Sequence, residues 1–296
     1  MTEAVGGQVV FRSSRHLMVR VGDEDWRCEA RGLLRQGEGT SLVVGDLVEV
    51  EPDGVRAGRI MRVLPRRNQL SRRREVGGGR ELVVAANLDR VVAFFAARRP
   101  RLKLGTLDRL LIAAEHNDLP ATIVVNKADL GLSDELEQQL AEYPALGYPV
   151  LLVSVHTGEG VAEFQALLGR GANVISGPSG VGKSSMLSRI LGIELRVADV
   201  SEANEKGKHT TTAATWYALP GGGAVVDTPG FRDYGLWDLA PEQVARHMPD
   251  LLPHVQACRF RDCLHRGEPG CAVRAAAEAG TVSARRYRSY LGILDS

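Results

Sequence analysis

The chain has 296 residues, of which 44% are hydrophobic and 25% charged, a composition typical of folded domains rather than of disordered chains. Its length allows two or three compact domains. The first residues lack the basic and apolar stretches of a secretory signal, and apolar runs such as residues 91–97 are too short to cross a bilayer. We therefore expect a cytoplasmic protein with no membrane partner.

The net charge of +1 conceals an uneven distribution of charges along the chain. Residues 66–109 carry 12 Lys and Arg against 4 Asp and Glu, whereas residues 110–256 carry 9 against 18. The basic part includes PRRNQLSRRRE at 65–75, which is rich in Arg, and Arg pairs bidentately with phosphate. This pattern favours RNA as a partner, although a solvated surface would also produce it.

Residues 1–70 alternate apolar and polar positions in short runs broken by Gly, as in VVGDLVEVE at 43–51. This period of two, with closely spaced turns, is typical of a small antiparallel barrel. An RNA-binding, all-β barrel of the OB type fits the length, and an SH3-like barrel would give the same pattern. Between residues 64 and 79 the pattern breaks into Arg and Gly, which predicts a linker or mobile loop.

From residue 81 onward, strand-like and helix-like stretches alternate. Strands are predicted at 121–126 and 149–154, and helices at 106–117, 134–143 and 182–191. Such alternation indicates a mostly parallel sheet with helices on both faces, which binds ligands at the carboxyl ends of its strands. We assign this α/β domain to residues 71–238, between the barrel at 1–70 and a C-terminal domain at 239–296.

The stretch NVISGPSGVGKSS at 173–185 contains a phosphate-binding loop of the form G-x-x-x-x-G-K-[ST], between a predicted strand and a predicted helix. The Gly residues let backbone N–H groups surround the β-phosphate, and the next helix points its N-terminus at the anion. Lys183 would reach the β- and γ-phosphates, and the Ser184 hydroxyl would bind Mg²⁺. We expect nucleotide contacts from Gly177, Pro178, Ser179, Gly180, Val181, Gly182, Lys183, Ser184 and Ser185.

Two further stretches are typical of segments that respond to a γ-phosphate. Asp227 follows an apolar run and begins DTPG, where an acidic residue commonly provides a second anchor for Mg²⁺ and Gly230 would offer its N–H to the γ-phosphate. The Thr-rich stretch GKHTTTAAT at 207–215 would complete the Mg²⁺ shell through Thr211 or Thr212.

The tetrapeptide Asn126-Lys127-Ala128-Asp129 ends the predicted strand at 121–126, where a base could dock. The Asp129 carboxylate can accept hydrogen bonds from N1–H and the 2-amino group of guanine, and adenine offers neither donor. After the next predicted strand, Ser154 and Val155 would close over the base with hydroxyl and backbone donors. The expected guanine contacts are therefore Asn126, Lys127, Ala128, Asp129, Ser154 and Val155.

In an ordinary GTPase the phosphate loop precedes the guanine motif, but here the order is reversed. The termini of a compact α/β domain often lie close together, so they can be joined and the chain cut elsewhere without disturbing the sheet. The order predicts a circularly permuted P-loop GTPase. Phe231 stands where many GTPases have Gln, so His209 or a group from the partner would align the attacking water. The predicted catalytic residues are Lys183, His209 and Asp227.

Near the C-terminus, three Cys and one His offer ligands for a metal ion. Cys258, Cys263, His265 and Cys271 would fill a tetrahedral shell, which predicts one structural Zn²⁺. The segment around them is short and polar, so the metal would supply its folding energy. Arg259, Arg261, Arg266 and the RRYR of 285–288 would decorate the resulting domain with charges suited to RNA.

Together these motifs resemble the RsgA (YjeQ) family of circularly permuted, small ribosomal subunit biogenesis GTPases: VGDLVEVE, LPRRNQLSRR, NKAD, GPSGVGKSS, KHTTT, DTPGF and CRFRDCLHRGEPGCAV. The resemblance implies a circularly permuted GTPase domain, preceded by an OB-type barrel and followed by a small, mainly helical, zinc-binding domain. It also implies a monomer that binds the small ribosomal subunit and its rRNA, and hydrolyses GTP to GDP and phosphate when the subunit stimulates it.

Two other functions are compatible with the motifs. A small-molecule kinase would use the same phosphate loop, but it would not need the guanine motif or the Thr-rich stretch. A passive RNA-binding protein could retain a vestigial nucleotide site.

Overall fold

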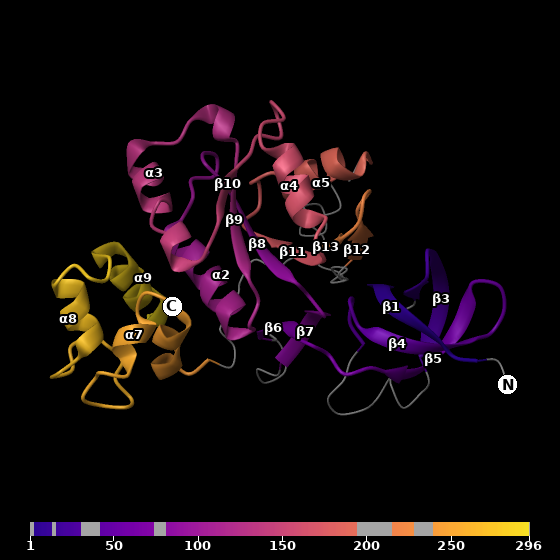
Figure 1. Cartoon of the computed structure of the whole chain (residues 1–296), viewed down its shortest axis with the longest axis horizontal. Coiled ribbons are helices and arrows are strands. Elements are labelled where there is room, and N and C mark those ends of the chain that lie inside the picture. The colour runs from indigo at the N-terminus through magenta and orange to yellow at the C-terminus, as the bar shows by residue number, and fades with distance from the viewer. Residues whose placement is uncertain are drawn as a thin grey trace, which may run out of the picture.

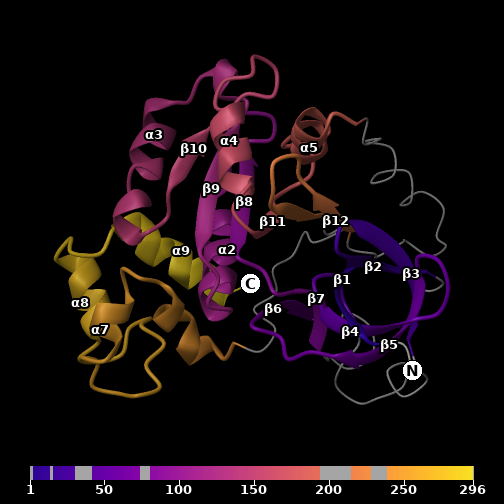
Figure 2. The same ribbon diagram turned by 45° about the vertical axis from the view of Figure 1, so that its right-hand side comes forward.

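The computed structural model describes residues 3–13, 16–30, 42–73, 81–193, 215–227 and 239–295. The N-terminal strands close into a barrel, which Figure 2 shows beside the larger α/β part. Strand β3 runs parallel to β5 and β4 pairs back onto β1, so the barrel has the connectivity β1-β2-β3-β5-β4-β1. The predicted OB-type barrel is confirmed. Its strands are β1 (Val5–Arg12), β2 (Leu17–Val21), β3 (Glu24–Ala30), β4 (Leu47–Pro52) and β5 (Ala57–Val63).

The segment after the barrel was predicted to be a linker, and this prediction is wrong for part of it. Strand β6 (Gln69–Arg73) pairs with β7 (Glu81–Ala86) in an antiparallel hairpin. Before it, Arg66 donates to the buried carboxylate of Asp46, with Nε 2.7 Å from Oδ1. Arg66 therefore joins the barrel to the hairpin instead of facing an RNA. Its neighbour Arg67 forms an ion pair with Asp89 at 2.6 Å.

The α/β part is built on a central sheet covered by helices on both faces (Figure 1). Its strands follow the order β10 (Val150–Leu152), β9 (Ala121–Asn126), β8 (Arg90–Ala96), β11 (Ala172–Ser176), β13 (Ala224–Asp227) and β12 (Thr215–Ala218). Neighbouring strands are parallel except for β12 against β13. The expected parallel sheet is confirmed.

Alternation along β8 divides the core into two clusters. Phe95 packs with α2 (Leu104–His116) and α3 (Asp134–Leu140), whereas the adjacent Phe94 packs with α4 (Val161–Leu168) and α5 (Lys183–Leu191). Successive side chains of a strand point to opposite faces of the sheet, so a fully apolar strand contributes to the core on both faces. Two short 3₁₀ turns, η1 (Ala128–Leu130) and η2 (Pro144–Leu146), lie in the connections on either side of α3.

The C-terminal residues form a small helical unit that packs against α2. Its elements are η4 (Pro241–His247), α7 (Leu252–Val255), α8 (Ala272–Glu278) and α9 (Ala284–Leu294). Arg285 and Arg286 of α9 were expected on an RNA-binding surface, and this expectation is wrong. The Arg286 side chain is 2% exposed and bonds to buried Asp108 of α2, while Arg285 bonds to Glu142 at 2.8 Å. Among the described helices, none is both long enough and apolar enough to span a bilayer.

Candidate functional site

The phosphate loop and the guanine motif lie at the same edge of the central sheet. The guanine motif follows β9 and the phosphate loop follows β11, and both strands flank β8 in parallel. The carboxyl ends of all three strands therefore meet. The reversed order along the chain leaves the two motifs next to each other in space.

The phosphate loop approaches β8 so closely that its first residue must be Gly. A Cβ on Gly177 would lie 1.8 Å from the carbonyl oxygen of Phe94. Gly180 and Gly182 have φ of 77° and 99°, in the left-handed region that other residues rarely adopt. Lys183, the first residue of α5, folds back over the loop and donates from Nζ to the carbonyls of Gly177 and Pro178, each at 2.7 Å. Ser184 and Ser185 follow in the first turn of α5.

Asn126 joins the guanine motif to the phosphate loop through direct hydrogen bonds. Its buried side chain donates from Nδ2 to the carbonyl of Val181 at 2.8 Å. Its Oδ1 accepts from the backbone N–H of Val155, in the base loop, at 3.1 Å. A single side chain thus fixes the spacing of the three segments, which the tetrapeptide pattern alone did not reveal.

Lys127 makes a second bridge between the motifs. Its Nζ donates to the carbonyl of Gly180 in the phosphate loop at 2.8 Å and to the carbonyl of Arg99, after β8. The backbone of Lys127 has a φ of 62°, and the next residue, Ala128, donates to the carbonyl of Val153 at 3.1 Å. These contacts hold the motif in a sharp turn between β9 and η1.

Asp129, the predicted reader of guanine, lies at the exposed end of this turn. Its Oδ1 accepts a 2.5 Å hydrogen bond from the hydroxyl of Ser154, which is fully buried. The same hydroxyl accepts from the N–H of Thr157 at 3.1 Å. The carboxylate is therefore oriented by a hydroxyl that is itself held in place, and its other oxygen accepts no hydrogen bond from the described residues.

Arg189 of α5 supports the base loop, and no motif in the sequence pointed to it. Its Nη1 donates to the carbonyl of Val155 at 2.8 Å. Its Nη2 would lie 2.8 Å from a Cβ built on Gly158, a residue with a φ of 91°. The helix that begins in the phosphate loop thus also braces the loop expected to cover the base.

The remaining predicted nucleotide residues are only partly described. The backbone of Asp227 ends β13 and pairs with Ile175 of β11, so it lies at the same edge of the sheet as the phosphate loop. His209, Thr211, Thr212 and Gly230 lie outside the described residues.

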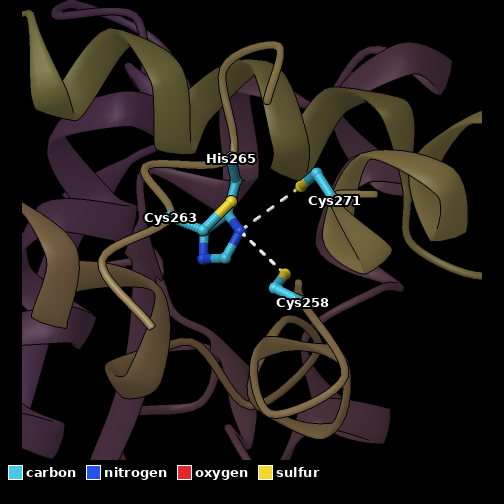
Figure 3. A group of neighbouring side chains, drawn as sticks. All are labelled: Cys258, Cys263, His265 and Cys271. Carbon is cyan, nitrogen blue, oxygen red and sulfur yellow. Dashed lines mark hydrogen bonds between the residues drawn. The ribbon is translucent and has the colours of Figure 1, made fainter. Parts of the chain in front are cut away.

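The predicted metal ligands converge in the C-terminal unit (Figure 3). The ligand atoms of all four side chains lie within 4.8 Å of one another. The Nδ1 of His265 lies 3.4 Å from the Sγ of Cys258 and from the Sγ of Cys271, and Cys271 also accepts from the N–H of Arg274 at 3.3 Å. Cys263 completes the group and is 4% exposed.

The electrostatics of this cluster suit a bound cation. Burial raises the pKa of the Cys263 thiol to about 12 and also raises the pKa of Cys271, while burial lowers the pKa of His265. Thiols bind metal as thiolates, and a divalent cation supplies the positive charge that stabilises them. Three sulfurs and one imidazole nitrogen match the tetrahedral donor set of a structural site. The cluster can therefore hold a metal ion.

Comparison with known proteins gives consistent results. A family model described as RsgA GTPase matches residues 63–237. The "Small ribosomal subunit biogenesis GTPase RsgA" of Gemmatimonas aurantiaca is 46% identical over 90% of this chain and 86% of its own length. The protein of the same name from Chlorobaculum parvum is 40% identical over 100% of this chain and 99% of its own.

Solved structures agree with the fold. The crystal structure of YjeQ from Thermotoga maritima is 33% identical, with a TM-score of 0.80 over 99% of this chain and 98% of that one. YloQ, described as a circularly permuted GTPase, is 26% identical, with a TM-score of 0.74 over 99% of this chain and 94% of that one. The reversed motif order, the barrel before it and the Cys/His cluster after it therefore have one explanation: the chain belongs to the RsgA GTPase family.

Proposed function

We propose that this protein binds the small ribosomal subunit late in its maturation and hydrolyses GTP to GDP and phosphate, with turnover stimulated by the subunit. The observation that carries the proposal is the hydrogen bond from Asn126 to Val181, because it joins a guanine-reading motif and a phosphate loop into one site. The names of the relatives support the ribosomal partner. They favour this function over a kinase or a passive RNA-binding protein.

Within this site each group has a distinct task. Asp129 would accept from the guanine base, and the loop N–H groups with Lys183 would neutralise the phosphates. Ser184 and Asp227 would hold Mg²⁺, which neutralises charge that develops on the phosphate oxygens. Thr211 or Thr212 would complete the magnesium shell. His209 remains our candidate for orienting the attacking water.

The flanking units would bind the subunit. We assign the barrel of residues 1–70 and the C-terminal domain of residues 239–296 to rRNA contacts, with the GTPase domain of residues 71–238 between them. Zn²⁺ held by Cys258, Cys263, His265 and Cys271 would keep the C-terminal domain folded. We propose that the protein acts as a monomer in the cytoplasm.

The test is GTP turnover measured with and without purified small ribosomal subunits at a stated salt concentration. We expect turnover to be slow alone and faster with subunits. Lys183→Ala should lower stimulated turnover by about 100-fold or more, because the phosphates lose their main cationic partner. Arg170→Ala removes an exposed cation away from the site and should leave turnover unchanged.

Two results would contradict the proposal. Turnover that subunits do not change would rule out the ribosomal role. ATP that displaces GTP as effectively as GDP does would rule out a guanine-specific site and favour the kinase alternative.

A further inference from the structure

A strongly basic loop follows β8, directly beside the nucleotide site. We call residues 98–103, with the sequence RRPRLK, the basic loop. Arg98, Arg99, Arg101 and Lys103 are all exposed. In the described part of the chain the only ion pair formed by these side chains joins Arg101 to Glu135 at 3.5 Å, with 83% and 66% of the two side chains exposed. An ion pair this exposed contributes little stabilisation, and it neutralises only one of the four cations of the loop.

The basic loop forms one wall of a hollow of about 630 Å³. The opposite wall comes from α3 and the residue before it, with Ser133, Glu135 and Gln139. Leu102 and Leu136 also line the hollow. Glu135 is the only acidic residue among the lining residues. A hollow with a cationic rim and one carboxylate suits a phosphate with its attached sugar better than an apolar ligand.

The same loop rests on both nucleotide-binding motifs. The carbonyl of Arg99 accepts from Nζ of Lys127, which also donates to the phosphate loop at Gly180. Pro100 lies 3.8 Å from the position that a Cβ on Gly180 would take. Arg99 and Lys127 both adopt a left-handed backbone, with φ of 51° and 62°. Non-glycine residues are held in this conformation only where their surroundings fix it, often at functional positions.

We propose that the basic loop binds the phosphate backbone of the small-subunit rRNA and that this contact acts on GTP hydrolysis through Lys127. The inference rests on the proposed function and adds the contact through which the particle would stimulate turnover. Three of the four cations are Arg, whose planar guanidinium pairs with a phosphate through two hydrogen bonds. A phosphate drawn into the hollow would move the loop. The Arg99–Lys127–Gly180 contacts would then pass the movement to the phosphate loop.

The test uses Arg98→Ala/Arg101→Ala in the full-length protein, because both residues line the hollow. The two substitutions leave in place the carbonyls of Arg99 and Gly180 that accept from Lys127. At a fixed, non-saturating concentration of purified small subunits, stimulated turnover should fall by about tenfold. Turnover without subunits should equal that of the unchanged protein. The negative slope of log affinity against log salt should become shallower by about 2, since two phosphate contacts are lost.

Matched variants separate this effect from a general loss of charge. Arg98→Lys/Arg101→Lys keeps both charges and should recover part of the stimulation. Arg170→Ala removes an exposed Arg of the GTPase domain outside the basic loop and should match the unchanged protein in stimulation and in salt slope.

The outcomes are distinguishable. If subunits fail to stimulate the unchanged protein, the proposed function itself is wrong. If subunits stimulate the unchanged protein and Arg98→Ala/Arg101→Ala equally, and both proteins have the same salt slope, only the basic-loop inference is wrong. If the variant binds weakly but is stimulated fully at saturating subunits, the coupling through Lys127 is wrong. Photo-crosslinks from position 98 to a ribosomal protein rather than to rRNA would overturn the assignment of RNA.

Discussion

We propose that the carboxylate of Asp129 reads the base, and we predict that a single substitution changes which base the site accepts. Guanine offers two donors to a carboxylate, at N1 and at the 2-amino group, whereas xanthine carries an oxygen in place of the amino group. An Asn at this position would donate to that oxygen and still accept from N1–H. We expect Asp129→Asn to weaken GTP binding by about 100-fold and to strengthen binding of xanthosine triphosphate, measured by competition against a fluorescent guanine nucleotide.

Ser154→Ala provides the matched control for Asp129→Asn. It removes the 2.5 Å hydrogen bond that orients Asp129 but leaves the carboxylate in place. GTP binding should weaken by less than in Asp129→Asn, with no gain for xanthosine triphosphate. Unchanged GTP affinity in Asp129→Asn would show that this carboxylate does not read the base.

At the scale of secondary structure, a strand made of consecutive apolar residues was predictable from the sequence. Pairings between residues far apart in the sequence were not. Strand β9 has the bounds expected from ATIVVN because six buried positions in a row indicate a central parallel strand. Strand β6 was missed because its QLSRR sequence resembles a charged linker, whereas its strand conformation depends on pairing with β7. Likewise, nothing near Arg66 in the sequence announces its partner Asp46, which lies 20 residues earlier in the chain.

The segment that carries the metal ligands depends on its side chains, rather than on regular secondary structure, to stay folded. Residues 256–271, all of them described, contain neither helix nor strand, so few backbone hydrogen bonds hold them. We expect chelation of the metal, or Cys263→Ser, to unfold this segment while the central sheet persists. Hydrogen exchange should then increase at 256–295 and stay unchanged in β8 and β9. The bound metal, which we propose to be zinc, should fall in elemental analysis from one ion per chain to none.

Cys28→Ser is the control for the metal prediction. Cys28 is buried in the barrel, far along the chain from the ligand cluster, and burial raises the pKa of its thiol to about 11. This variant should keep its metal and the protection of residues 256–295. Full protection of that segment after complete removal of the metal would contradict the prediction.

For the whole molecule, the sequence predicted the three parts and their order but not how the last part is attached. The permutation follows from the positions of two motifs, because each motif has a fixed place relative to its strand. The attachment depends on Arg286 and Asp108, which are 178 residues apart in the chain. Exposed and buried Arg look alike in a sequence, so the RRYR of 285–288 was assigned to an RNA-binding surface.

Arg286 joins the C-terminal unit to the GTPase domain, and its removal should lower the free energy of unfolding of the protein. Its guanidinium lies 2.5 Å from fully buried Asp108 and 2.7 Å from Asp250. Arg286→Ala would therefore remove this partner of Asp250 and leave Asp108 with the longer contact to Arg285, at 3.4 Å. Removing one partner of a buried pair costs about 3–5 kcal/mol, and we expect a loss of that size in urea unfolding. Arg288→Ala, on the exposed side of α9, should change the unfolding free energy by less than about 0.5 kcal/mol. Equal stability of the two variants would show that the buried network does not join the domains.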